Sequence, residues 1–70
     1  MIAAEYLVVE RQRQWWVMLN GFRQGPYVSR QIAIDSAVSS ARLGLKSGRP
    51  ARVSVQDSNV FETVYDFGVT

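Results

Sequence analysis

The sequence predicts an α+β fold in which one amphipathic helix packs on one face of an antiparallel β-sheet. Three observations lead to this prediction. Residues 30–46 carry apolar side chains at spacings of three and four. Short segments on both sides of them are rich in β-branched and aromatic residues. The chain has 70 residues, which suits a single domain, 1–70, with one core.

The chain ahead of the helix predicts three strands. They are the segments of strand-forming residues at 6–9, 15–19 and 22–28. Polar Arg11–Gln14 predicts a turn or a frayed connection. Asn20-Gly21 favours a type I′ hairpin turn, because both central residues of that turn need positive φ. The third segment contains Gly25-Pro26, and proline belongs on a sheet edge or at a bulge.

The helix has clear sequence boundaries. Ser29 is a suitable N-cap, because a serine hydroxyl can accept a hydrogen bond from the first turn. Gly48 suits a left-handed C-terminal position, and Pro50 prevents the helix from continuing. The small alanines of the apolar stripe allow the helix to lie close to the sheet. The stripe consists of Ala33, Ile34, Ala37, Val38, Ala41 and Leu45.

Two strands follow the helix. Residues 51–56 alternate between apolar and polar, which predicts a half-buried strand with Val53 and Val55 pointing inward. Asp57-Ser58-Asn59 predicts a turn, and residues 60–67 predict the last strand. The predicted order is β-β-β-α-β-β. Since one helix covers one face, the other face of the sheet is left to solvent or to a partner.

The composition excludes several kinds of chemistry. The chain has no cysteine and no histidine, so disulfides, thiolate metal sites and the commonest general base are all missing. The six acidic residues form no close pair along the sequence. Gly44–Ser47 lacks the upstream glycine that a phosphate-binding loop requires. We therefore predict a protein that is not an enzyme, with no catalytic, cofactor or metal site.

The sequence also lacks the signs of export or membrane insertion. Met1–Glu5 contains no basic region ahead of an apolar run. The longest apolar stretch, Trp15–Leu19, has five residues, whereas a bilayer requires about 20. We expect a cytoplasmic protein without a membrane partner.

A series of short motifs runs through residues 6–68. They are Tyr6-x-Val8-Val9, Trp15-x-Val17 with Gly21, Ser29 ahead of Ala33-Ile34 and Ala41-Arg42, Arg52–Val55, Asp57-Ser58-Asn59 and Asp66-Phe67-Gly68. In order and spacing the chain resembles the bacterial family called domain of unknown function 2188. It departs from that pattern at Gln14, where the family tends to have glycine, in its lack of histidine, and in a closing strand about one residue longer. The resemblance implies the fold described above and leaves the function open, since the family brings no established activity.

Alternation along the strands assigns side chains to the two faces. In register with the resemblance, Tyr6, Val8, Trp15, Val17 and Leu19 face the helix. The candidate interface on the open face is then apolar: Leu7, Val9, Trp16 and Met18. Side chains of this size form a patch of roughly several hundred Å², which is typical of an interaction site. The alternative is that a terminal segment or the 22–28 strand covers them.

Two interaction functions follow from this face. The first is a homodimer that pairs open sheet faces around Trp16, since buried aromatic residues dominate interfaces. The alternative is a nucleic-acid-binding accessory protein in which Trp16 stacks or wedges. Its candidate nucleic-acid contacts are Arg11, Arg13, Arg23 and Arg52. All eight basic residues lie within 11–52 beside a single acidic one, Asp35, although the net charge is only +2 and these residues also serve to solubilise the helix and turns.

Overall fold

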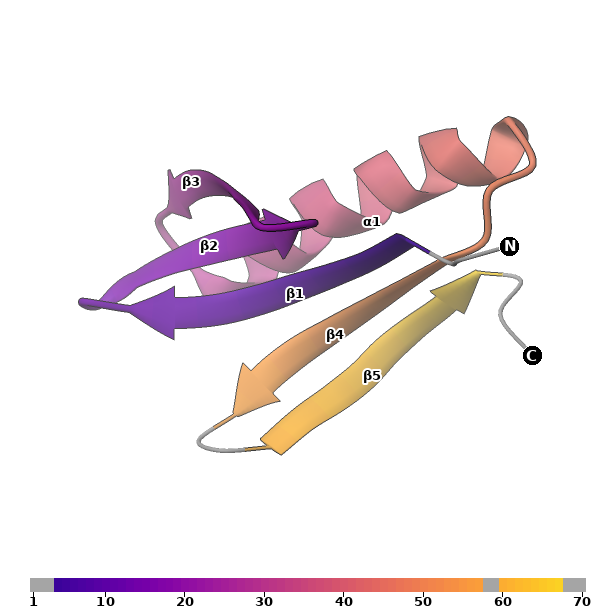
Figure 1. The fold of residues 1–70 in the computed structure, drawn as a ribbon. Coiled ribbons are helices and arrows are strands. Elements are labelled where there is room, and N and C mark those ends of the chain that lie inside the picture. The colour runs from indigo at the N-terminus through magenta and orange to yellow at the C-terminus, as the bar shows by residue number, and fades with distance from the viewer. Residues whose placement is uncertain (1–3, 58–59, 68–70) are drawn as a thin grey trace.

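The computed structural model describes residues 4–57 and 60–67, which form five strands and one helix (Figure 1). In chain order they are β1 (Ala4–Arg11), β2 (Gln14–Leu19), β3 (Phe22–Tyr27), α1 (Arg30–Lys46), β4 (Ala51–Asp57) and β5 (Val60–Phe67). The α+β class, the order of elements and the helix bounds are confirmed. Asp57, assigned to a turn by the sequence, ends β4, while Ser58, Asn59 and Gly68 lie outside the described residues.

The strands form one sheet in the order β3-β2-β1-β4-β5. Three of the four pairings are antiparallel, but β1 and β4 run parallel, from Ala4 opposite Ala51 to Val8 opposite Val55. The prediction of a wholly antiparallel sheet is therefore wrong for this pair. The reason is the direction of the chain. β1 and β3 run the same way, α1 returns along the sheet, and β4 then runs in the direction of β1.

The core lies between α1 and one face of the sheet. The helix contributes Ala33, Ile34, Ala37, Val38 and Ala41, all of them buried. The strands contribute Tyr6, Val8, Val17, Ala51, Val53 and Val55. The three alanines are 0–1% exposed, so the helix axis lies close to the valines of the sheet. Leu45, which the predicted stripe includes, is 41% exposed in the last turn of the helix.

The ends of α1 are fixed as the sequence predicts. Ser29 Oγ accepts a hydrogen bond from the backbone N of Ile32 at 3.2 Å. At the other end Gly48 has φ +83°, and its N–H and that of Arg49 donate to the carbonyls of Leu45 and Gly44, both at 2.9 Å. These caps set where the chain leaves β3 and where it enters β4.

Two tight hairpin turns join the first three strands. Asn20 and Gly21 have φ of +52° and +83°, as expected for the predicted type I′ turn. Gln12 and Arg13 form a second two-residue turn, with φ of +56° and +66°, so of the two predicted alternatives the turn is confirmed. Neither is glycine, and the left-handed conformation costs such residues about 1 kcal/mol each. As expected, the proline of Gly25-Pro26 lies on an edge strand, next to a register shift between β2 and β3.

Candidate functional site

The four predicted interface residues form two cross-strand pairs on the sheet face that α1 leaves open. Leu7 lies opposite Met18, and Val9 lies opposite Trp16. The helix-facing set is also as predicted: Tyr6, Val8 and Val17 are in the core, with Trp15 and Leu19 packed against it. The adjacent tryptophans therefore point to opposite sides of the sheet.

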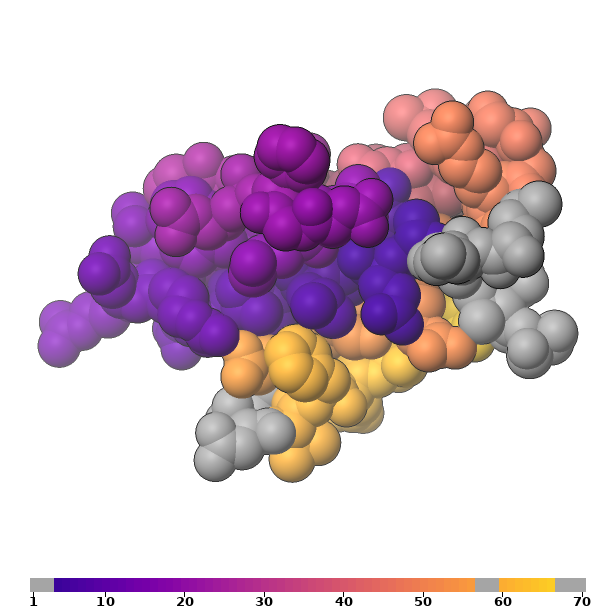
Figure 2. Space-filling view, viewed as in Figure 1, coloured from indigo at the N-terminus to yellow at the C-terminus, as the bar shows by residue number. Residues whose placement is uncertain are grey.

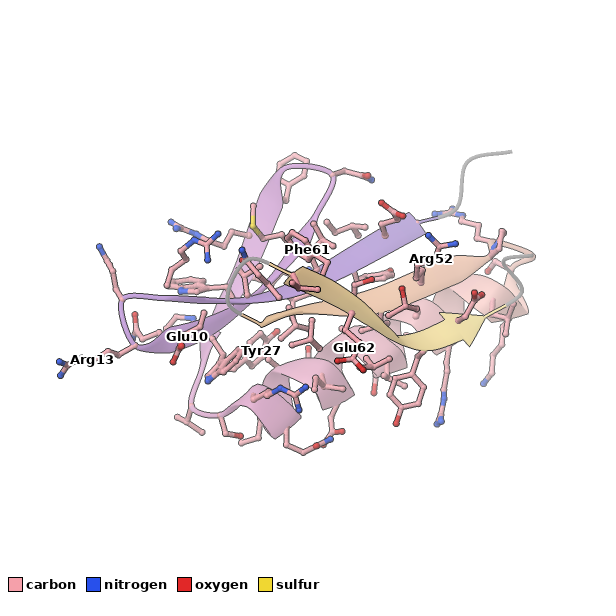
Figure 3. All side chains as sticks on the ribbon, turned by 90° about the horizontal axis from the view of Figure 1, so that it is seen from below. Glu10, Arg13, Tyr27, Arg52, Phe61 and Glu62 are labelled. Carbon is pink, nitrogen blue, oxygen red and sulfur yellow. The ribbon has the colours of Figure 1, made fainter. Side chains whose placement is uncertain are left out.

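The apolar surface of this face differs from the predicted patch. Val9 is only 2% exposed, so its neighbours already cover it, while Leu7, Trp16 and Met18 are half-buried. Phe61 of β5 adds a side chain that is 51% exposed. It lies opposite Gln56 and projects on the side of the sheet away from the helix (Figure 3). Sequence reasoning missed Phe61 because the alternation of a strand does not show which neighbour the strand takes.

Trp16 lies in a hollow of about 370 Å³ at the end of the open face formed by β1, β2 and β3. Its lining residues are Val9, Arg11, Gln12, Trp16, Met18 and Arg23. The guanidinium carbon of Arg23 is 4.5 Å from the centroid of the Trp16 ring, a cation–π contact. The Trp16 Nε1–H donates to the backbone carbonyl of Arg11 at 3.4 Å. The indole is thus held in one orientation, with a cation over its face.

The charges around the hollow are positive. Arg11 Nη1 donates to the carbonyl of Glu10 at 2.8 Å and to Oε1 of Gln56 at 3.0 Å, and both acceptors are uncharged. The Glu10 side chain is on the helix side, because Glu10 lies opposite Trp15. Among the described side chains of residues 4–56 and 60–66, Arg11 and Arg23 form no ion pair. An anion that enters the hollow would therefore meet two guanidinium groups.

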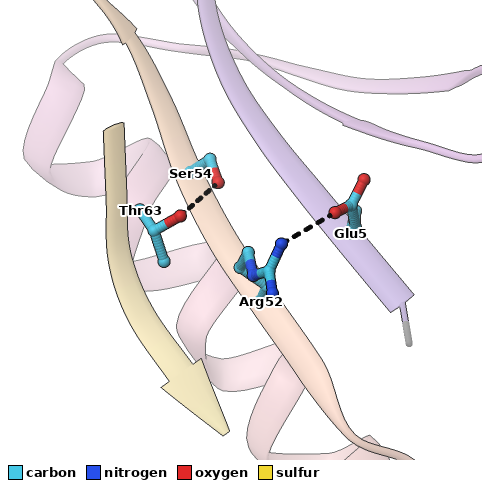
Figure 4. A network of polar contacts seen from close by, with 4 residues as sticks. All are labelled: Glu5, Arg52, Ser54 and Thr63. Atoms are coloured by element: carbon cyan, nitrogen blue, oxygen red, sulfur yellow. Dashed lines mark hydrogen bonds and ion pairs between the residues drawn. The ribbon is translucent and has the colours of Figure 1, made fainter. Parts of the chain in front are cut away.

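The far end of the same face has a different electrostatic character. Arg52 Nη1 lies 3.3 Å from Oε1 of Glu5 (Figure 4). Asp66 is directly opposite Arg52 on β5. The neighbouring hydroxyls of Ser54 and Thr63 lie 3.4 Å apart. Arg11 lies six residue steps after Glu5 on β1, a distance of about 20 Å along the strand. Arg52 therefore has two acidic neighbours, Glu5 and Asp66. It belongs to a different part of the open face from the hollow around Trp16.

The four candidate nucleic-acid contacts thus occupy three places. Arg11 and Arg23 line the hollow, Arg13 is exposed in the adjacent β1–β2 turn, and Arg52 is in the ion pair at the far end. Figure 2 shows this face, with β1 between β3 and β5. Gln12 and Gln56 are further polar residues of the site that sequence reasoning missed. The turn at Gln12-Arg13, which brings Gln12 to the hollow, lacks the glycine that would have signalled it.

Other kinds of site find no counterpart in the part of the chain that the structure describes. The described side chains of residues 4–56 and 60–66 contain no group of three or more acidic, histidine or cysteine side chains arranged to hold a metal ion. The helix in this part of the chain is too short and too polar to cross a bilayer.

Comparison of the chain with protein-family models, curated proteins and solved structures finds no match. The resemblance to domain of unknown function 2188 therefore stays a prediction from the sequence.

Proposed function

We propose that this chain is a non-catalytic module that binds nucleic acid through its open sheet face. The observation that supports this proposal is the hollow that Trp16 lines together with Arg11 and Arg23, neither of which forms an ion pair with a described side chain of residues 4–56 and 60–66. Guanidinium groups bind phosphates, and the Trp16 ring with the Arg23 guanidinium over it offers a base a surface for stacking. Within this proposal the protein acts in the cytoplasm, the compartment expected from its sequence.

The number of cations sets the expected strength of binding. Arg11 and Arg23 line the hollow, and Arg13 projects from the adjacent turn. Three phosphate contacts predict that log K falls with log salt concentration with a slope of about −2 for a single strand. A net charge of +2 adds little long-range attraction, so we expect binding at low salt that weakens strongly at physiological salt.

Fluorescence anisotropy of labelled single-stranded and duplex oligonucleotides at several salt concentrations tests the proposal. The variant Arg11→Ala/Arg23→Ala should lose most of the affinity and reduce the salt slope. The matched control is Arg30→Ala/Arg49→Ala, which removes the same charge from exposed positions on α1 and just after it. The control should bind almost as the wild type does. The absence of binding to any oligonucleotide at low salt would overturn the proposal, as would an equal loss in both variants.

A second candidate, self-association through the same face, is supported by the apolar pair Leu7–Met18 and by the 51% exposed Phe61. A two-fold dimer would bury these side chains around Trp16 against a second copy. Sedimentation of the wild type and of Trp16→Ala measures this directly. The control Leu43→Ala truncates an apolar side chain that is 66% exposed on the helix. A wild type that is monomeric at high concentration would exclude the dimer.

A further inference from the structure

We infer that the hollow around Trp16 takes one unstacked base of a single strand, while the flanking phosphates lie on Arg11 and Arg23. This inference rests on the proposed function and narrows it. It names the form of nucleic acid, the part of the ligand that enters the hollow, and the residues that hold it.

The depth of the hollow favours a single strand over a duplex. Its floor is recessed: Val9 is 2% exposed, and Met18 and Trp16 are half-buried. Arg11 and Arg23 at its rim are exposed, so an approaching ligand contacts them before it reaches the floor. In a duplex the phosphates are outermost. The bases remain stacked in the interior, and only their edges are exposed in the grooves. Phosphates resting on the arginines would therefore keep duplex bases away from the floor. A single strand can turn a base inward while its backbone stays on the rim.

The chemistry of the lining fits a base and gives little sequence preference. The indole of Trp16 and the guanidinium over it form a stacked pair on one side, and half-buried Met18 adds apolar surface above the covered Val9. Every base has a flat face that can stack on such a pair. The indole N–H already donates to the carbonyl of Arg11, so it does not read base edges. The amide of Gln12 can both donate and accept, so it can bond to the edge of any base.

Three probes with the same number of phosphates separate the parts of this inference: an oligothymidylate, an abasic strand of equal length, and a duplex of the same charge count. The oligothymidylate should bind about tenfold more tightly than the abasic strand, because only it has bases to stack. The duplex should bind with an affinity close to that of the abasic strand. Trp16→Leu should remove the advantage of the oligothymidylate and leave the salt slope unchanged.

Tryptophan emission of two conservative variants provides a second measurement that does not depend on how Trp16→Leu folds. In Trp15→Phe, Trp16 is the remaining tryptophan, and oligothymidylate should quench its emission. In Trp16→Phe, Trp15 reports from the helix side and its emission should stay constant. Quenching by the abasic strand to the same extent would contradict the inference.

The outcomes distinguish this inference from the proposed function. If no nucleic acid binds, both fail. If all three probes bind equally, or the duplex binds most tightly, the proposed function survives and the single-base site is overturned. If polyglutamate binds as tightly as oligothymidylate, the surface belongs to an acidic protein partner and the inference is overturned.

Discussion

The two faces of the sheet bury neighbouring residues of one strand by different means. Val8 is 0% exposed beneath the alanines of α1, whereas Val9 is 2% exposed on the face that carries no second layer. Val9 lines the hollow together with Trp16 and two arginines. On the helix face, apolar side chains of α1 cover the sheet. On the open face, arginine side chains with apolar stems and charged heads contribute to the cover. Side chains of the second kind can move aside for a ligand without unpacking the core.

The largest expected effect compares these two valines directly. Val8→Ala should lower the free energy of unfolding by about 2 kcal/mol, because the cavity it creates lies between two rigid layers. Val9→Ala should cost about 1 kcal/mol, since side chains of the open face can settle into the space. Urea unfolding of both variants measures the difference. A cost for Val9→Ala equal to that for Val8→Ala would show that the open face is packed as rigidly as the core.

Loss of the helix N-cap should have the second-largest effect on stability. It should leave ligand binding at the open face unchanged. Ser29→Ala removes the hydrogen bond from Ser29 Oγ to the Ile32 N–H, which should lower the free energy of unfolding by about 1 kcal/mol. Ser39→Ala, at an exposed position within the helix, is the matched control and should change stability very little. Oligonucleotide affinity should stay constant in both variants. A loss of binding in Ser29→Ala would mean that the two faces are coupled.

A smaller effect is expected at the cation–π contact. Arg23→Gln removes the guanidinium over Trp16 and should lower the free energy of unfolding by about 0.5 kcal/mol. Arg13→Gln removes the same charge from the exposed turn and should leave stability unchanged. Thermal unfolding at matched ionic strength compares the two. Equal shifts would mean that net charge determines the result and the contact with the indole does not.

The smallest effect is expected at the ion pair of the open face. The side chains of Arg52 and Glu5 are 36% and 59% exposed, so solvent screens their attraction. Glu5→Gln should therefore change the free energy of unfolding by about 0.3 kcal/mol, and added salt should abolish the change. Chemical denaturation at low and high salt checks this. A salt-independent loss would indicate that the pair is more enclosed than its exposure implies.

Local patterns in the sequence were sufficient for the elements and for the faces of the early strands. Ser29 and Gly48 mark the helix ends, and Asn20-Gly21 marks a turn, because each depends on its own neighbours. The opposite orientation of Trp15 and Trp16 follows from the period of a strand. These features need no knowledge of which strands are adjacent.

The features that the sequence did not reveal depend on long-range packing. The choice of β4 as the neighbour of β1 decides that Gln56 reaches Arg11 and that Phe61 joins the open face. Alternation assigned Val9 to that face but did not predict its burial, which comes from side chains of other strands. The sequence left residues 11–14 open between a turn and a frayed connection, because Gln12 and Arg13 adopt left-handed conformations without glycine.

The central place of β1 in the sheet has a consequence for folding kinetics. β1 pairs with β2 through a two-residue turn, and such hairpins form in about 1–10 μs. Its other neighbour, β4, starts about 40 residues after β1 ends, so this pairing must wait for the long crossover through β3 and α1 to close. During synthesis the second edge of β1 stays unpaired until β4 has been made. We therefore expect the docking of α1 to limit the folding rate, so that substitutions beneath the helix slow folding, whereas substitutions around Trp16 leave the rate unchanged.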